Sequence, residues 1–347
     1  MTPAPEAPVP GAPEPAGART RPDGVGALDG LAGLTWRPLR AEDLAELSDL
    51  VARCERFDDP PYRTSTDELA GDVFEASDAD LADGTIAGFD EAGRALAYGR
   101  VRRAGDGRSA VIGGGVDPSL RRRGIGSVIL GWQLARARAL VGELVTVTTY
   151  VEDGMGDQVA MLEEEGFTAQ RRFTELRRDL SQPLPDVALR TPLTLEPWRS
   201  ELDEQVRLAH NESFGDAAGA GAGGASVESW REGIANVVPE WSFLVMDRST
   251  DRTPIAGYLL SGRYEQDWPA LGYTSGYTDL LGVRREYRGR RVATALLVAA
   301  MRAYRDAGME YACLGVDSAL DDAESTLYGQ LGFEATRGST LWARTLA

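Results

Sequence analysis

Two arginine- and glycine-rich turns of one pattern are the residues in this sequence best suited to chemistry. The first turn, from Gly115 to Gly126, reads GVDPSLRRRGIG, and the second, from Gly282 to Ala293, reads GVRREYRGRRVA. Each follows an apolar run and precedes apolar residues at helical spacing, so we expect strand, turn and helix in that order. The free N–H groups and positive dipole end of a helix start attract anions. The residues therefore predict two sites for a phosphate or diphosphate group.

The residues expected to bind this anion form two matching sets. The first set is Val116, Arg121, Arg122, Arg123, Gly124, Ile125, Gly126 and Ser127, and the second is Val283, Arg288, Gly289, Arg290, Arg291, Val292, Ala293 and Thr294. Small residues let the backbone approach a diphosphate, and arginines add charge-assisted hydrogen bonds. Neither turn has the G-x-G-x-x-G pattern of a dinucleotide-binding fold or the lysine of a P-loop. We therefore expect diphosphate binding by a different device.

Further landmarks repeat in the same order, which indicates duplication of a whole domain. Residues 34–40 (LTWRPLR) correspond to 193–199 (LTLEPWR), and Glu165-Gly166-Phe167 corresponds to Leu331-Gly332-Phe333. The expected organisation is a disordered Pro/Ala/Gly-rich tail at 1–30, a first domain at 31–182, a linker at 183–187 and a second domain at 188–347. At this length each domain can close its own hydrophobic core.

Composition excludes several classes of function. The net charge of −17 disfavours nucleic acid as a partner, and no apolar run is long enough for a membrane span. All 37 basic residues are arginine, and the single histidine is His210, so histidine-ligated metal sites and histidine-based triads are not expected. We expect no metal. One cysteine in each repeat, Cys54 and Cys313, is typical of a reducing cytoplasm.

Periodicity predicts an α/β fold in which helices cover a sheet. Strands are expected at 110–112, 144–148 and 311–316, and one helix is expected after each turn. The glycine-rich segment 215–224 is expected to be a surface insertion or a substrate lid.

The repeated residues resemble the GNAT superfamily of acyl-CoA N-acyltransferases. Arg121-x-x-Gly124-x-Gly126 is similar to the family's R/Q-x-x-G-x-G/A motif, and residues 327–333 (LYGQLGF) resemble its closing L-Y-x-x-x-G-F motif. The two-domain layout is similar to that of actinobacterial tandem GNAT proteins. The resemblance implies two splayed, mixed β-sheets flanked by helices, acetyl-CoA as co-substrate, and direct transfer of the acetyl group to an amine.

The two copies depart from the family pattern in complementary ways. The first turn is intact, but Leu162 stands where the second copy has Tyr328. The second copy keeps the tyrosine, but Arg291 replaces the glycine that corresponds to Gly124. That arginine side chain either crowds the diphosphate or points outward and adds a cation.

The resemblance assigns Tyr328 as the acid that protonates the leaving thiolate. For the base, Tyr277 and Asp279 share a face of the strand before the second turn, and Asp279 is the nearest carboxylate. The first copy has Ala110 at the place of Tyr277. Backbone N–H groups near Val116 and Val283 are suited to polarise the thioester carbonyl.

These residues predict a cytoplasmic acetyl-CoA-dependent N-acetyltransferase that acts on a primary amine of a small molecule. Chemistry is expected in the second domain, and the acidic charge suits a cationic acceptor. Catalysis in the first domain, acetylation of proteins and a non-catalytic acyl-CoA-binding module remain alternatives. The chain can be a monomer or a homodimer.

Overall fold

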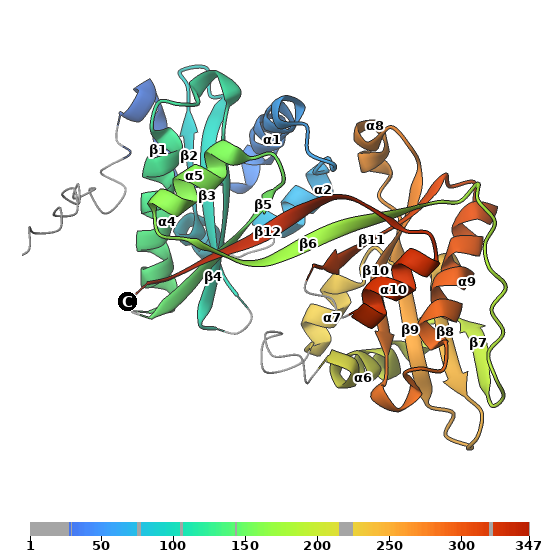
Figure 1. Cartoon of the computed structure of the whole chain (residues 1–347). Helices are drawn as coiled ribbons and strands as arrows, with labels where there is room; N and C mark the ends of the chain where they lie inside the picture. Colours follow the sequence, from blue (N-terminus) through green and yellow to red (C-terminus); the bar gives the residue numbers. More distant parts are fainter. Residues whose placement is uncertain are drawn as a thin grey trace, which may run out of the picture.

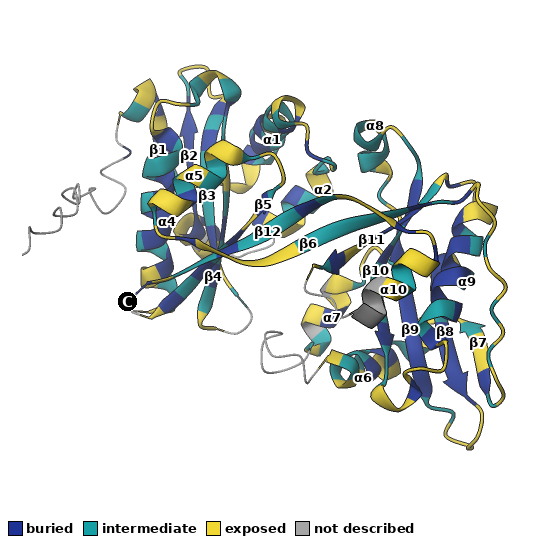
Figure 2. Ribbon diagram, viewed as in Figure 1, coloured by how far each residue is buried: buried dark blue, intermediate teal, exposed yellow. Residues whose placement is uncertain are grey.

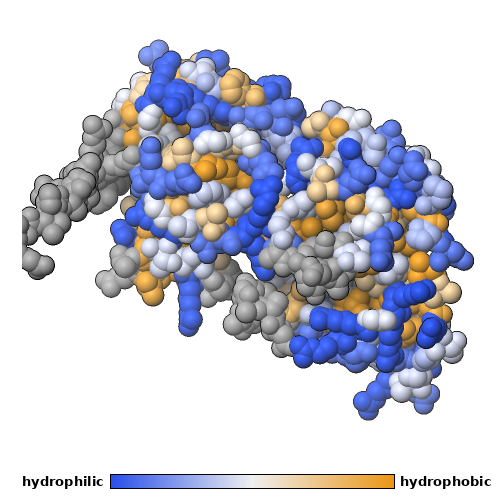
Figure 3. Space-filling view, in the orientation of Figure 1, coloured by the Kyte–Doolittle hydropathy of each residue, from blue (hydrophilic) through white to orange (hydrophobic). Residues whose placement is uncertain are grey.

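The computed structural model describes residues 28, 30–74, 78–104, 107–142, 144–214, 225–318 and 322–346. The tail expected at 1–30 lies almost wholly outside the described residues, as does the segment 215–224. Two lobes lie side by side, and two long strands run between them (Figure 1). The face in Figure 3 shows hydrophilic side chains on both lobes, with hydrophobic areas between them.

The first lobe holds most of the first repeat. Its elements are β1 (Thr35–Arg37), α1 (Leu44–Asp58), α2 (Thr66–Leu69), α3 (Asp78–Gly84), β2 (Thr85–Phe89), β3 (Ala95–Arg103), β4 (Ser109–Val116), α4 (Ile125–Val141), β5 (Val145–Glu152) and α5 (Gly156–Glu164). The repeat closes with β6 (Thr168–Asp179). Helices cover both faces of this part of the sheet, with α1 on one face and α4 and α5 on the other (Figure 1).

The second lobe repeats the order of strands and of the last two helices. It contains β7 (Leu193–Pro197), α6 (Asp203–Phe214), α7 (Val227–Gly233), β8 (Phe243–Asp247), β9 (Ile255–Gly262), α8 (Trp268–Leu271), β10 (Ser275–Val283), α9 (Val292–Asp306), β11 (Tyr311–Asp317) and α10 (Asp322–Gln330), and the second repeat closes with β12 (Glu334–Leu346). Both α4 and α9 therefore follow a strand and a turn directly, as the sequence predicts.

The closing strands of the two repeats are exchanged. The sheet order is β1-β2-β3-β4-β5-β12-β6-β11-β10-β9-β8-β7. Strand β12, at the end of the second repeat, pairs with β5 of the first, and β6 pairs with β11 of the second. The resemblance implies two sheets, and the structure corrects this: β6 and β12 pair with each other and join the strands of the described residues into one sheet of twelve.

Packing of the core follows the same exchange. Trp342 and Leu346 of β12 belong to the hydrophobic core around α4 in the first lobe. Leu180, next to the end of β6, and Leu176 pack in the core around α9 in the second lobe. Figure 2 shows buried strands at the centre of each lobe and an exposed stretch of β6 between them. Each lobe therefore buries apolar side chains that the other repeat supplies.

The local predictions hold closely. The strand expected at 110–112 lies inside β4, and that expected at 311–316 is β11. Strand β5 starts one residue later than expected and extends to Glu152. No helix in the part of the chain that the structure describes is long and apolar enough to cross a membrane.

Candidate functional site

The first turn has the backbone of an anion-binding loop. Strand β4 ends at Val116, and α4 begins at Ile125 after Arg122 and Gly124, which have φ angles of 61° and 79°. No side chain accepts a hydrogen bond from the first N–H groups of α4. A Cβ on Gly124 would have no neighbour within 4 Å, which leaves space outside the loop. This turn can hold a diphosphate through backbone groups.

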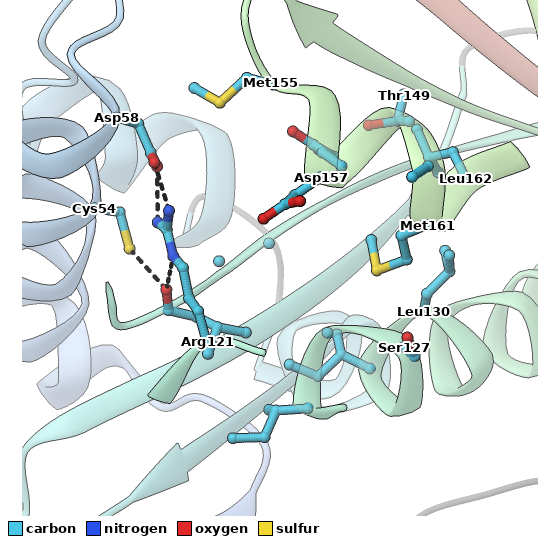
Figure 4. Close-up of a pocket in the computed structure, with 18 of the residues that line it drawn as sticks. Cys54, Asp58, Arg121, Ser127, Leu130, Thr149, Met155, Asp157, Met161 and Leu162 are labelled. Carbon is cyan, nitrogen blue, oxygen red and sulfur yellow. Dashed lines mark hydrogen bonds and ion pairs between the residues drawn. The ribbon is translucent and has the colours of Figure 1, made fainter. Parts of the chain in front are cut away.

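Arg121 braces this turn, which is a different role from the phosphate contact expected of its side chain. Its Nε donates to the carbonyl of Val116 at 3.0 Å, and its Nη1 and Nη2 atoms bond both oxygens of Asp58 at 2.5 and 2.7 Å (Figure 4). The guanidinium thus ties the strand end to α1. Arg122 pairs with Asp157 at 2.9 Å near the solvent, and Arg123 is exposed.

A cavity of about 760 Å³ opens over the first turn (Figure 4). Of the residues expected to bind the anion there, its lining includes Val116, Arg121, Arg122, Gly124, Ile125, Gly126 and Ser127. Strands β4 and β5 stop pairing after Val111 and Thr148, and the cavity reaches Thr149 beyond that point. It therefore extends from the turn into the gap between the two strands.

The second turn has the same backbone, with glycine and arginine interchanged at its two positions of positive φ. Here Gly289 has φ 74° and Arg291 has φ 63°, in the places of Arg122 and Gly124. Arg288 donates to the carbonyls of Val283 at 3.4 Å and Ser213 at 3.3 Å, as Arg121 braces the first turn. Arg291 is exposed.

The other residues expected at the second site lie around this turn. The guanidinium of Arg290 stacks over the ring of Tyr287 at 5.3 Å. The residues that form the first turn of α9 are Val292, Ala293 and Thr294. The structure thus brings the second set together in the arrangement of the first.

A β-bulge distinguishes the second repeat from the first. The pairing of β10 with β9 shifts register between Thr278 and Leu280, whereas β4 pairs with β3 without a shift. Thr278 reaches Tyr304 of α9, while Leu280 packs with the core on the opposite face. Asp279 therefore sits at the bulge, a feature common beside active sites because it redirects side chains.

A second cavity, of about 550 Å³, lies between the two repeats. It is lined by Pro61, Tyr62, Arg63, Thr64, Glu68 and Asp72 from the first repeat, by Glu175 and Arg337 from the exchanged strands, and by Tyr264, Gln266, Asp267, Leu271, Ser275, Tyr277 and Cys313 from the second. The backbone N–H of Arg63 donates to the Asp267 carboxylate at 2.8 Å, and the side-chain amide of Gln266 donates to the Glu68 carboxylate at 3.0 Å. These bonds close the two repeats around the cavity.

Burial raises the pKa of three carboxyl groups in or beside this cavity. It raises the pKa of Glu175 to about 7 and the pKa values of Asp267 and Asp279 to about 6. It also holds the pKa of the Tyr277 hydroxyl well above its usual value. Carboxyl groups with pKa values near neutral are suited to accept a proton from an ammonium group.

The three expected catalytic residues take different positions around β10 and β11. Tyr277 lines the cavity between the repeats and donates to Glu175 at 3.2 Å. Asp279 accepts a hydrogen bond of 2.9 Å from Tyr264. Tyr328 lies on α10 and packs with the core around α9 on the other face of the sheet, edge-on to Phe333. In the first repeat the matching Leu162 is fully buried and lines the larger cavity.

Sequence reasoning missed Glu175. It belongs by sequence to the closing strand of the first repeat, and only the exchange of β6 brings it next to Tyr277. Its raised pKa has no signal in the residue pattern, because it depends on burial between the repeats. No cluster of three or more potential metal ligands is found among the residues with described positions.

Known proteins match both the second repeat and the whole fold. The Acetyltransferase (GNAT) family matches residues 210–333. A mycothiol acetyltransferase from Brachybacterium faecium is 34% identical over 129 residues, which cover 36% of this chain and 36% of that protein. The match therefore spans about a third of this relative.

Two solved structures share the arrangement of nearly the whole chain. A GCN5-related N-acetyltransferase from Sphaerobacter thermophilus has a TM-score of 0.69 at 23% identity, and covers 90% of this chain and 95% of its own. A tandem GNAT protein from the clavulanic acid biosynthesis pathway has a TM-score of 0.67 at 17% identity, with coverages of 90% and 98%. The chain has the fold of a tandem GNAT protein. In this GNAT fold, the first turn connects β4 to α4, and the second turn connects β10 to α9.

Proposed function

We propose that this tandem GNAT protein transfers the acetyl group of acetyl-CoA to a primary amine of a small molecule, in its second repeat. The observation that carries the proposal is the β-bulge at Asp279 beside the cavity between the repeats. The bulge and Tyr328 are both features of the second repeat, whereas the first has a regular strand and Leu162. The similarity of residues 210–333 to the GNAT family supports the same assignment.

The acetyl group would lie in the gap that opens between β10 and β11. The two strands pair from Ser275 and Tyr311 as far as Thr278 and Leu314. Tyr277 reaches the gap from the face of the sheet that bears the cavity, and Tyr328 packs on the face that bears α9. An acceptor amine and a leaving sulfur can thus be served from opposite faces, with Tyr328 as the acid.

We propose the cavity between the repeats as the acceptor site. Its lining includes Glu68, Glu175 and Asp267, and this acidic surface favours a cationic amine. Bound acetyl-CoA supplies the activated acetyl group. The first repeat would bind a second acetyl-CoA in its 760 Å³ cavity without catalysing transfer. We propose residues 31–182 and 188–347 as the two repeats of the sequence. We also propose a cytoplasmic location, which is supported by the free thiols of Cys54 and Cys313.

Thiol release from acetyl-CoA with a panel of cationic and neutral amines tests this function. We expect turnover with at least one small amine, and a loss of kcat of about a hundredfold in Tyr328→Phe, because the thiolate then lacks its acid. The affinity for acetyl-CoA should stay unchanged in that variant. Tyr150→Phe, at an exposed tyrosine of the first repeat, is the matched control.

Three results would contradict parts of this proposal. Full activity in Tyr328→Phe would remove the acid assignment. Loss of turnover on blocking the first cavity alone would place catalysis in the first repeat. Binding of acetyl-CoA without thiol release on any amine would leave a non-catalytic acyl-CoA-binding module.

A further inference from the structure

A carboxyl group from the first repeat lies at the point where β10 and β11 separate. Leu314 is the last residue of β11 that pairs with β10, so Gly315 is the first residue of β11 beyond that pairing. A Cβ on Gly315 would lie 3.0 Å from the hydroxyl of Tyr277 and 3.9 Å from Oε2 of Glu175. The Tyr277 hydroxyl and the Glu175 carboxyl therefore sit directly over this glycine, at the narrow end of the gap.

Strand exchange is the reason that Glu175 occupies this place. Strand β6 runs antiparallel to β11, and its register sets Glu175 opposite Gly315. Strand β12 covers the other edge of β6, so β6 is held on both sides by strands of the second repeat. Regular pairing with β11 thus positions the carboxyl group, which is more precise than placement by a loop, while the pairing with β12 shifts register at Glu175, between Ala335 and Gly338.

The groups around Glu175 come from five elements. They are Tyr277 on β10, Cys313 on β11, Arg337 on β12, Glu152 on β5 and Asp267 in the 3-10 turn before α8. Burial is the main cause of the raised pKa of Glu175, and the negative charges of Glu152 and Asp267 add to it. The hydrogen bond from Tyr277 and the charge of Arg337 act in the opposite direction.

Asp279, the base expected from the sequence, is less well placed than Glu175. One of its oxygens accepts the hydrogen bond from Tyr264, and the other would lie only 2.6 Å from a Cβ on Gly262 of the neighbouring strand. Asp279 thus faces β9 and Tyr264, whereas Glu175 is one of the residues that line the 550 Å³ cavity. A base must reach the proton that it removes, so geometry favours Glu175.

We propose that Glu175 is the general base for acetyl transfer in the second repeat, so that the first repeat completes the active site of the second. This inference rests on the proposed function. The carboxylate takes one proton from the acceptor ammonium and later releases it to solvent. The nitrogen lone pair then forms the C–N bond, and the C–S bond breaks with its electron pair on sulfur. Tyr328 protonates that sulfur. The nitrogen still carries one proton more than a neutral amide, and this proton returns to the Tyr328 tyrosinate.

Kinetics across the pH range test the base in the full-length protein. We expect kcat/KM of the unchanged protein to rise with pH through about 7, because the carboxylate is the active form. Glu175→Gln should lose about a hundredfold at neutral pH and lose this rise. Glu175→Asp should keep the rise at a reduced rate. Tyr277→Phe removes a hydrogen bond that lowers the pKa of Glu175, so the rise should move to higher pH.

Asp279→Asn is the matched control, and it should keep the rise near pH 7. If Glu175→Gln keeps the pH profile and Asp279→Asn loses it, the base is Asp279 and this inference fails, while the proposed function stands. If the unchanged protein releases no thiol with any amine, both fail together.

Urea unfolding without any substrate gives a second, independent readout. A buried Glu175 with a raised pKa binds its proton more tightly in the folded state than in the unfolded state. The unchanged protein should therefore lose stability relative to Glu175→Gln as the pH rises from about 5 to about 7, and the difference should level off above that. A difference that does not change with pH would show an ordinary exposed carboxylate and overturn the inference.

Discussion

At the scale of single residues, the two turns show that one backbone can be built with the glycine in different places. Both turns need two residues with positive φ, and the first uses Arg122 and Gly124 where the second uses Gly289 and Arg291. A non-glycine residue in this conformation costs about 1 kcal/mol, and each turn accepts that cost once. Arg291 therefore keeps the shape of the loop.

The effect of Arg291 on acetyl-CoA binding can be measured in a protein whose first cavity is blocked. We expect Arg291→Gly to weaken binding at the second turn by about fivefold, or about 1 kcal/mol, because one cation near the diphosphate is lost. The effect should shrink at high salt. Calorimetry at two salt concentrations checks this, with Arg285→Gly as the control. Tighter binding in Arg291→Gly would show that the side chain crowds the ligand.

At the scale of elements, an arginine in each turn braces the strand before it against the helix after it. Arg121 and Arg288 each return to the last carbonyl of the preceding strand, at Val116 and Val283. The strand end and the helix start are thus held at a fixed distance, which keeps the N–H groups of the turn in place for a diphosphate. The arginine spacing in the sequence reflects this brace as well as the charge.

Blocking the first turn tests whether the two turns bind independently. Gly124→Trp should reduce the acetyl-CoA stoichiometry from about two to about one, because the side chain enters the 760 Å³ cavity. Turnover at saturating acetyl-CoA should persist. Equilibrium dialysis measures the stoichiometry, and Gly124→Ala, which has the same backbone strain without the bulk, is the control. Complete loss of binding would show that the second turn does not bind alone.

At the scale of the whole molecule, the exchanged strands make the two repeats one folding unit. Strand β6 leaves the first repeat to pair with β11, and β12 returns to pair with β5. Trp342 is buried in the first lobe and Leu180 in the second. Separation of the repeats would expose unpaired strand edges and apolar side chains, both of which favour aggregation.

A protease site inserted between Pro185 and Asp186, which are both exposed, tests this unity. After cleavage we expect the two halves to elute together under native conditions and to separate only in denaturant. The halves should aggregate when they are produced apart. Size-exclusion chromatography and denaturing gels provide the measurement. Two separately soluble and folded halves would contradict the exchange.

Residue patterns determined the local structure well, because turns and helix starts depend on neighbours in the chain. The glycines and arginines of 115–126 and 282–293 indicated both loops, and the apolar spacing located α4 and α9. The family resemblance at Arg121, Gly124 and Tyr328 indicated the GNAT fold. The duplication was also visible, since the landmarks recur in order.

Only the tertiary structure decided which strand completes which sheet. The patterns of β6 and β12 are compatible with either lobe, because a strand presents the same alternation of side chains to any partner edge. The exchange, the cavity between the repeats and the place of Glu175 beside Tyr277 all follow from that choice. The sequence by itself thus determined the two turns and the chemistry they suit, whereas long-range pairing decided that both repeats build the proposed acceptor site.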